Sequence, residues 1–310
     1  MSARDSSTTT WRDWSCTVLV TTTGPRQPEA AADVVRDLMA DVERAVSRFR
    51  PDSDLERVND GAGRLVAVRP LTFRLVETAL RAARLTHGAV DPTLGATLCA
   101  LGYDADIAVV RGRPASSWAP THRPGGGRWR SVRLDRTLLR VGIPAGVRLD
   151  LGATAKAWTA DEAARRVQRR LGGAVLVGIG GDLAAAGRVG RPWRIDVAET
   201  EGADAVRVGL SHGGLATSSV TGRRWTAADG AVRHHVVDPR TGLPAAGRWR
   251  TASVWAPTAL AANVASTWAL VDSEAAAGHL TERGLAARLV DREGRVELHG
   301  DWPSEEAAAS

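Results

Sequence analysis

Gly146-Val-Arg-Leu-Asp-Leu-Gly-Ala-Thr-Ala-Lys-Ala-Trp158 is the stretch on which the prediction of fold and function depends. The chain has 41 lysines and arginines, and Lys156 is the only lysine. A lysine is a compact point charge, whereas an arginine presents a planar fork. Chance survival in an arginine-rich composition would also explain it. Val147–Leu151 is typical of a buried strand and Thr159–Leu171 has helical spacing. We therefore expect Lys156 at a strand–turn–helix junction, six residues after Asp150, where backbone N–H groups bind anions.

Length and composition indicate a soluble globular protein. The chain has 310 residues, of which 44% are hydrophobic and 25% charged, and a chain of this length buries about three quarters of its unfolded surface. The net charge of +6 and the pI of about 10.6 raise the possibility of nucleic-acid binding. The arginines are interleaved with Asp and Glu and form no dense basic block, so we expect no nucleic-acid partner.

Cysteine usage and hydropathy bear on compartment. Cys16 and Cys99 are the only two cysteines, and their separation fits neither a disulfide framework nor a metal site. The first fifteen residues are polar, so we expect no signal peptide. No run reaches 18 apolar residues, so we expect no membrane span and a cytoplasmic protein.

Hydrophobic periodicity predicts both helices and strands along the chain. We expect an α+β fold with mixed or antiparallel sheets in two interleaved subdomains. We expect one domain over residues 14–290, a surface loop at 111–130, and flexible tails at 1–13 and 304–310. The expected helices are Pro28–Phe49, Leu71–Thr86, Thr159–Leu171 and Ala259–Val271. The expected strands include Trp14–Thr22, Ala174–Ile179, Trp193–Val197, Ala252–Ala256 and a hairpin at Trp129–Val141.

Four polar clusters fall at the ends of these elements. They are Asp150 with Lys156, Asp91-Pro-Thr93, Ser218 and Ser219 with His235, Asp238 and Arg240, and Asn263 with Ser266 and Thr267. Each alone is common turn or capping chemistry, and His234 and His235 adjoin in a predicted strand, so only one can face a site. Together they fit phosphoryl or nucleotidyl transfer. A lysine offsets diphosphate charge, oxygen atoms suit Mg²⁺, and a histidine can deprotonate a hydroxyl.

Six motifs in order carry a resemblance to a known family. They are Ser47-Arg-Phe-Arg-Pro-Asp-Ser53, Gly88-Ala-Val-Asp-Pro-Thr93, Leu149-Asp-Leu-Gly-Ala-Thr-Ala-Lys156, Gly180-Gly-Asp182, His235-Val-Val-Asp-Pro-Arg-Thr-Gly242 and Ala262-Asn-Val-Ala-Ser-Thr267. From Trp14 to about Val290 the sequence resembles the ApbE family of FAD:protein FMN transferases, most closely its signal-less actinobacterial-type members. Gly180-Gly-Asp182 itself is expected to be a tight turn.

The resemblance implies a reaction and a set of site residues. FAD is split at its diphosphate, AMP leaves, and FMN is esterified to a Thr or Ser hydroxyl of an acceptor flavoprotein. His235 would be the base for that hydroxyl. The implied FAD contacts are Phe49, Val90, Asp91, Asp150, Lys156 and Val237, with Lys156 near the diphosphate and also counted as catalytic. The implied Mg²⁺ ligands are the Ala153 carbonyl and the side chains of Asn263 and Thr267.

The sequence departs from the family pattern at three places. Asn263 stands where an aspartate is usual, and an amide oxygen contributes no negative charge, so we expect weaker Mg²⁺ binding. Ser266 could add a ligand directly or through water. Ala157 replaces a common glycine, and the usual Met-Gly-Thr opening is absent. The alternatives are therefore an FAD pyrophosphatase that releases FMN and AMP, or a catalytically weak FAD-binding protein.

Overall fold

The computed structural model describes residues 6–23, 28–113, 127–200, 202–227, 229–303 and 306–307. The chain divides into two units, each assembled from separate segments. Unit 1 comprises Met1–Met39, Lys156–Gly222 and Gly247–Ser310, and unit 2 comprises Ala40–Ala155 and Arg223–Ala246. Both units contain helices and antiparallel strands. The α+β class and the interleaving of two subdomains, expected from the sequence, are confirmed.

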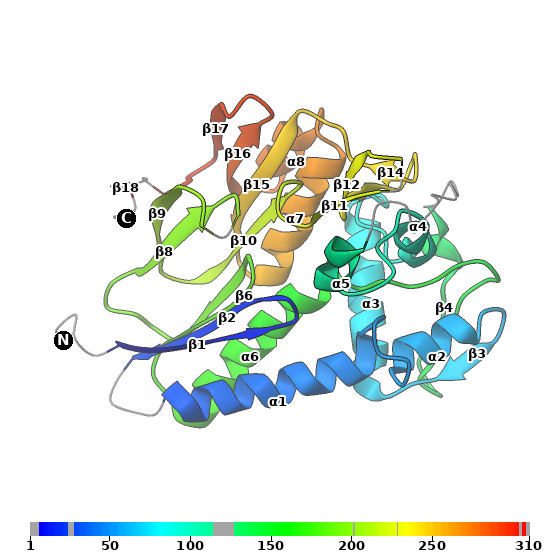
Figure 1. Cartoon of the computed structure of the whole chain (residues 1–310). Coiled ribbons are helices and arrows are strands. Elements are labelled where there is room, and N and C mark those ends of the chain that lie inside the picture. The colour runs from blue at the N-terminus through cyan, green and yellow to red at the C-terminus, as the bar shows by residue number, and fades with distance from the viewer. Residues whose placement is uncertain are drawn as a thin grey trace. The chain divides into compact units, whose positions relative to one another are not determined.

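Unit 1 is built on an eight-stranded antiparallel sheet with the order β1-β2-β6-β7-β10-β15-β16-β17 (Figure 1). These strands are β1 (Ser6–Asp13), β2 (Cys16–Thr23), β6 (Val175–Ile179), β7 (Asp182–Ala186), β10 (Gly213–Ser219), β15 (Trp249–Ala256), β16 (Ala286–Asp291) and β17 (Val296–His299). A second, three-stranded sheet consists of β8 (Trp193–Ala198), β9 (Ala205–Leu210) and β18 (Glu306–Ala307).

The two faces of the large sheet have different partners, because side chains alternate along each strand. Leu215 of β10 belongs to a buried cluster with Ile195 and Leu210 of the three-stranded sheet. Its neighbour Ala216 packs with Ala262 of helix α7 (Ala259–Val271) on the other face. Helix α7 runs beside β10 and β15 (Figure 1). The remaining helices of unit 1 are α6 (Ala155–Leu171), α8 (Ala276–Glu282) and the first part of α1 (Pro28–Val46).

Unit 2 is mainly helical, with short strands. Its helices are the end of α1, α2 (Asp54–Asp60), α3 (Pro70–Leu85), α4 (Gly95–Ala100), α5 (Ile107–Gly112) and the 3₁₀ helix η2 (Arg128–Ser131). Its strands form a three-stranded sheet of β3 (Leu65–Ala67), β5 (Arg140–Gly142) and β4 (Arg133–Asp135), and the pairs β11 (Arg224–Thr226) with β12 (Val232–His234) and β13 (Val237–Asp238) with β14 (Leu243–Pro244). The predicted hairpin at 129–141 corresponds to β4 and β5.

The N-terminal segment differs from the expected flexible tail. Residues 6–13 form β1, which pairs along the whole of β2. Trp14 and Ser15 connect the two strands with φ angles of 47° and 55°, as a two-residue hairpin turn of type I′ requires. The reason is local: the segment is rich in threonine, which favours extended backbone. At the other end, residues 306–307 pair with β9, although we expected them in a tail.

The Val147–Leu151 stretch is extended but is not the predicted strand. Among the described residues, its ladder contact is an isolated parallel bridge between Leu94 and Arg148. The backbone of Leu149 is paired instead by a side chain: Asn59 Oδ1 accepts from Leu149 N at 2.7 Å and Asn59 Nδ2 donates to Leu149 O at 3.2 Å. The Asn59 side chain thus makes the hydrogen bonds that a neighbouring strand would make. Hydrophobic periodicity cannot reveal such a side-chain partner.

Two further expectations concern loops and membranes. Of the predicted loop at 111–130, residues 111–112 end α5 and 128–130 lie in η2, while 114–126 are outside the described residues. Over the described ranges, no helix combines the length and the apolar character needed to cross a bilayer.

Candidate active site

A tight turn connects Asp150 to the start of α6. The amides of Thr154 and Ala155 both donate to Leu151 O, at 3.0 and 2.8 Å. Helix α6 begins at Ala155, four residues before the predicted start, so Lys156 lies in its first turn. The first backbone N–H groups of a helix have no intrahelical acceptor, which favours anions there. Ala153 is exposed on this turn and Lys156 is partly buried. The turn and the helix of the predicted junction are present, whereas the strand before them is not.

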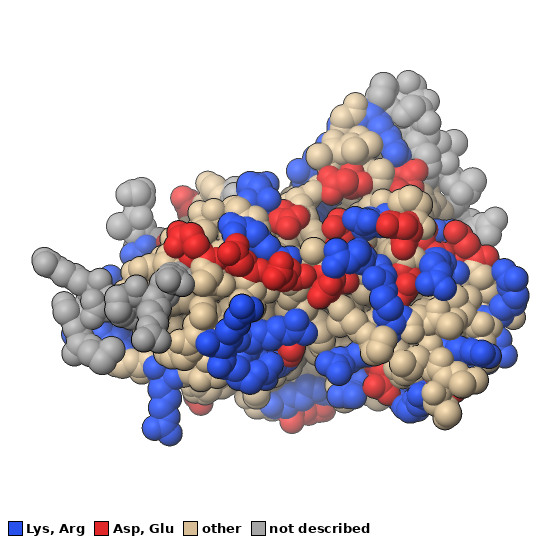
Figure 2. Space-filling view, turned by 90° about the horizontal axis from the view of Figure 1, so that it is seen from below, with Lys and Arg blue, Asp and Glu red and all other residues tan. Residues whose placement is uncertain are grey.

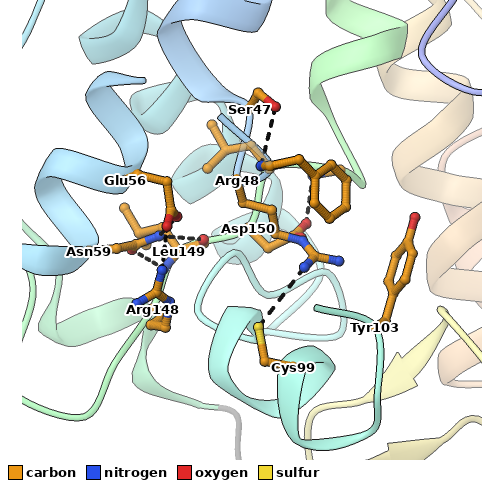
Figure 3. A network of polar contacts seen from close by, with 12 residues as sticks. Ser47, Arg48, Glu56, Asn59, Cys99, Tyr103, Arg148, Leu149 and Asp150 are labelled. Atoms are coloured by element: carbon orange, nitrogen blue, oxygen red, sulfur yellow. Dashed lines mark hydrogen bonds and ion pairs between the residues drawn. The ribbon is translucent and has the colours of Figure 1, made fainter. Parts of the chain in front are cut away.

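Asp150 is held by two contacts within unit 2. Its Oδ1 accepts from Gly152 N at 2.7 Å and shapes the turn. Its Oδ2 pairs with the guanidinium of Arg48, and the two side chains are only 14% and 8% exposed (Figure 3). The sequence prediction missed Arg48, which is one of many arginines in the chain, although it lies inside the quoted motif between Ser47 and Phe49.

Arg48 also organises an aromatic group. Its guanidinium lies 4.3 Å from the ring centroid of Phe49 and 4.5 Å from that of Tyr103. The Phe49 and Tyr103 rings meet edge to face at 5.9 Å, and Tyr103 stacks on Trp225 at 5.3 Å. Tyr103, Trp225 and Val237 share one buried cluster. The structure therefore brings together three predicted FAD contacts, Phe49, Asp150 and Val237, around Arg48 and Tyr103.

Phe49 differs from its partners in exposure. Its ring is 41% exposed, whereas Tyr103 is 5% exposed, and burial raises the pKa of the Tyr103 hydroxyl. A half-exposed ring backed by a guanidinium and a buried phenol is a suitable surface for a planar apolar ligand, because aromatic rings stack favourably with such partners.

Val90 and Asp91 lie in a buried turn. Asp91 Oδ1 accepts from the amide of Thr93 at 2.8 Å and from its hydroxyl at 2.6 Å, and Oδ2 accepts from Gly127 N at 2.7 Å. Burial raises the pKa of Asp91 despite these bonds. Asp91 thus fixes the local backbone, which is the ordinary turn chemistry of aspartate. The FAD contacts of Val90 and Asp91 stay predictions.

His235 lies between two short strand pairs rather than within a strand. Strand β12 ends at His234, and Val236 O, on the far side of His235, accepts from Ala245 N at 2.9 Å. The turn that follows is closed by Asp238, whose Oδ1 accepts from Arg240 N at 2.9 Å. This arrangement fixes the backbone on both sides of His235. Ser218 and Ser219, which the sequence analysis grouped with His235, belong to unit 1 instead.

Polar side chains of α7 meet polar side chains of the large sheet in unit 1. We call these five residues the α7 cluster: Asp182, Ser218, Asn263, Ser266 and Thr267. Asn263 Nδ2 donates to Asp182 Oδ1 at 2.8 Å. The Ser218 hydroxyl lies 2.8 Å from that of Ser266 and 3.2 Å from that of Thr267. The structure brings the predicted residues Asn263, Ser266 and Thr267 together with Ser218, and it adds Asp182.

The start of α7 is fixed by Asp161 of α6. The two carboxylate oxygens of Asp161 accept from the amides of Ala259 and Leu260 at 2.9 and 3.0 Å, and burial raises the pKa of this carboxyl. Thr258 caps the same helix through Ala261 N at 3.1 Å. These bonds satisfy three of the amides that a helix N-terminus leaves open. The first turn of α7 is therefore fixed, and this also fixes the position of Asn263 in the next turn.

The α7 cluster fits a hard cation. Asn263 is 9% exposed, and its Oδ1 is a buried acceptor without a hydrogen bond among the described residues. Mg²⁺ prefers carboxylate, amide and hydroxyl oxygens, and the cluster contains all three kinds. In the described part of the chain, no group of three His, Cys, Asp or Glu residues could hold a metal. A cation at the α7 cluster would therefore have one carboxylate nearby, with amide and hydroxyl oxygens as the remaining groups.

One surface hollow of unit 1 involves none of the predicted residues. It has a volume of about 350 Å³ and is lined by Val34 and Asp37 of α1 and by Arg166, Arg169 and Arg170 of α6. Figure 2 shows arginine and acidic side chains intermixed over the face seen from below. Glu162 offsets part of the positive charge on α6, because it pairs with Arg165 and Arg166 at 3.1 and 2.9 Å.

Comparison with known proteins gives consistent relatives. The model of the ApbE family matches residues 12–289. The FAD:protein FMN transferase of Klebsiella pneumoniae (strain 342) is 31% identical over 280 residues, which is 86% of this chain and 79% of the relative. The FAD:protein FMN transferase of Treponema pallidum (strain Nichols) is 31% identical over 261 residues, covering 77% of this chain and 70% of that protein.

Solved structures resemble the whole chain. The ApbE protein of Thermotoga maritima superposes with a TM-score of 0.83 at 25% identity, over 95% of this chain and 97% of that one. The apo flavinyl transferase ApbE of Pseudomonas stutzeri has a TM-score of 0.77 at 24% identity and covers 96% of each chain. With a family model that matches most of its length, this chain belongs to the ApbE family.

Proposed function

We propose that this protein is an FAD:protein FMN transferase that splits FAD and attaches FMN to a Thr or Ser hydroxyl of an acceptor protein. The observation that carries the proposal is 31% identity over 86% of the chain to the Klebsiella pneumoniae FAD:protein FMN transferase. The half-exposed Phe49 ring and the oxygen atoms of the α7 cluster support it, since one suits a flavin and the other a cation that assists diphosphate chemistry.

The proposed reaction forms one phosphoester and breaks one diphosphate bond. The acceptor hydroxyl oxygen attacks the flavin-side phosphorus of FAD, and the bridging bond to AMP breaks, so that AMP leaves with the bridging oxygen. His235 takes the proton of the attacking hydroxyl as general base. Lys156, in the first turn of α6, offsets negative charge on the diphosphate as it develops.

The flavin and the cation have separate protein partners in this proposal. Phe49, Val90, Asp91, Asp150 and Val237 bind FAD, with Arg48 holding Phe49 and Asp150 in place. Asn263, Thr267 and the Ala153 carbonyl are the groups that would hold Mg²⁺. When bound, Mg²⁺ neutralises charge on the diphosphate. Hydrogen bonds between Ser218 and Ser266 and between Asn263 and Asp182 hold these side chains in place.

A second candidate is an FAD pyrophosphatase, or an FAD-binding protein with weak catalysis. Asn263 is the observation that favours it, because an amide carries no charge with which to hold Mg²⁺. In the pyrophosphatase reaction water takes the place of the acceptor hydroxyl, and free FMN is the product.

One assay separates these functions. The protein is incubated with FAD, Mg²⁺ and a candidate flavin-carrying acceptor, and the acceptor is then examined for covalent flavin fluorescence after denaturing electrophoresis, with AMP measured in parallel. We expect a fluorescent acceptor and one AMP per flavin attached. An acceptor whose target Thr is replaced by Val is the matched control. AMP formed at the same rate without acceptor would indicate the pyrophosphatase, and FAD binding without AMP would indicate the binding protein.

A further inference from the structure

The orientation of the Asn263 amide is set by Asp182. A carboxylate can only accept hydrogen bonds, so the amide must turn its NH₂ group toward Asp182 Oδ1, as the 2.8 Å contact shows. The Asn263 oxygen then points away from Asp182. That oxygen is buried and accepts no hydrogen bond from the described residues. Leaving a buried acceptor unsatisfied costs about 1–3 kcal/mol, so a group that donates a hydrogen bond or carries positive charge would bind favourably at this oxygen.

Asp182 is itself firmly positioned. It is 2% exposed and opens β7 directly after the Gly180-Gly181 turn. That turn is pressed against β10: Thr217 N donates to Gly181 O at 2.9 Å, and a Cβ on Gly181 would approach Thr217 O to 2.7 Å. Asp182 pairs with Ala216 across the strands, and Ser218 lies two residues further along β10 on the same face. The Asp182 carboxylate is therefore held by the sheet on the face that packs against α7.

Asp182 also supplies the charge that position 263 lacks. The other four members of the α7 cluster, Asn263, Ser218, Ser266 and Thr267, are uncharged side chains. A hydrogen bond from an amide to a carboxylate polarises the amide and increases the negative charge on its oxygen. Residues that orient a metal ligand in this way commonly change metal affinity 10- to 100-fold.

We propose that Asp182 is a positioning residue for the divalent cation: it orients the Asn263 oxygen toward the ion and provides the negative charge that an aspartate at position 263 would otherwise provide. The proposal depends on the cation site of the proposed function but not on flavin transfer. It makes Asp182 and Asn263 a pair in which one carboxylate and one amide are needed, in either order.

Exchanging the two side chains tests this pair. The variants are Asp182→Asn, Asn263→Asp and the double exchange Asp182→Asn/Asn263→Asp. Mn²⁺ binding is measured by titration calorimetry and electron paramagnetic resonance, first with Mn²⁺ alone and then with FAD present, and thermal unfolding is recorded for each variant. Asp291→Asn is the control, because Asp291 is also 2% exposed and belongs to unit 1 but pairs with Arg295.

We expect Asp182→Asn to weaken Mn²⁺ binding about 10-fold or more, and the double exchange to restore binding to within about 3-fold of wild type. Asn263→Asp places two carboxylates in contact, so it should lower the unfolding temperature of the metal-free protein and recover it when Mn²⁺ is added. Asp291→Asn should lower stability and leave Mn²⁺ affinity unchanged.

Three results would overturn the proposal. The first is wild-type Mn²⁺ affinity in folded Asp182→Asn. The second is a folded double exchange that binds Mn²⁺ as weakly as Asp182→Asn. The third is no Mn²⁺ binding by the wild-type protein under either condition. Failure of flavin transfer with the expected Mn²⁺ pattern would reject the transferase function and leave the role of Asp182 standing.

Discussion

The α7 cluster of unit 1 differs in its charge balance from the Arg48 group of unit 2, by which we mean Arg48, Asp150, Phe49 and Tyr103. In the Arg48 group a buried guanidinium is paired with Asp150 and stacked on Phe49 and Tyr103, so its positive charge is already balanced. In the α7 cluster the Asn263 oxygen is buried and accepts no hydrogen bond from the described residues. The first arrangement is balanced by the chain's own groups, whereas the second would be completed by the cation of the proposed function.

This difference predicts different consequences for mutation. Removing one member of a buried ion pair leaves the other charge without compensation, and stability falls. Removing one oxygen from a cluster of hydroxyls changes stability little but removes a possible ligand. The two regions can therefore be told apart by comparing the free energy of unfolding with metal affinity.

Arg48→Ala is expected to have the largest effect. It leaves the Asp150 carboxylate, 14% exposed, without its partner and removes the support of the Phe49 ring, so the free energy of unfolding should fall by about 3–5 kcal/mol. Urea denaturation without FAD measures this loss. Arg50→Ala, whose side chain is 37% exposed and pairs with exposed Asp52, is the control and should change stability far less, because solvent screens exposed ion pairs. Equal losses in the two variants would contradict the role of Arg48.

In the proposed function Lys156 offsets negative charge on the diphosphate, so Lys156→Ala should reduce flavin transfer about 10²–10³-fold. Lys156→Arg should also be impaired, since the larger fork fits a point-charge site poorly. Transfer rates at saturating Mg²⁺ measure both effects. Arg169→Ala, on the same helix and 62% exposed, is the matched control. A Lys156→Arg variant with wild-type rates would refute the point-charge role.

The elements that carry strong periodicity were predictable. Ala259–Val271 was expected as a helix with the bounds that α7 has, and the strands at β6, β8 and β15 were expected within a few residues. The Val147–Leu151 stretch was not, because its apolar run is typical of a strand while its partner is the Asn59 side chain. Tertiary contacts of that kind leave no pattern in one sequence.

The sequence named several residues that the structure brings together, but it did not reveal the contacts that connect them. The family motifs named Asp150, Asn263 and Thr267, but Arg48 and Asp182 acquire their importance from contacts across 102 and 81 positions respectively. The sequence offered one further signal. Its only two asparagines are Asn59 and Asn263, and both use the amide group as donor or acceptor in a buried place.

Asp54 tests whether charge pairing is general in unit 2. Burial would raise the pKa of Asp54, but hydrogen bonds from Arg69 and Thr72 outweigh it and lower the pKa below 3.8. The carboxylate thus stabilises the fold above the unfolded pKa, and this contribution is lost as the pH falls through the folded pKa. Asp54→Asn should cost about 1.5–3 kcal/mol near neutral pH, and the difference from wild type should shrink at about pH 3. Denaturation curves at both pH values measure it, and a difference independent of pH would contradict this account.

Ser218→Ala should have the smallest effect on stability, and it tests most directly whether the α7 cluster binds a cation. The Ser218 hydroxyl bonds to those of Ser266 and Thr267, all three neutral groups, so its loss should cost about 0.5–1.5 kcal/mol. Thr217→Val is the matched control, because the Thr217 hydroxyl makes an equivalent 2.8 Å bond to Ser253 and its side chain points to the opposite face of β10. If the α7 cluster holds the cation, Ser218→Ala weakens Mn²⁺ binding while Thr217→Val does not, although each variant loses hydroxyl hydrogen bonding. Equal Mn²⁺ affinities in the two variants would mean that the hydroxyls beneath α7 only pack the helix against the sheet, and the cation site would then reduce to Asn263 and its neighbour Asp182.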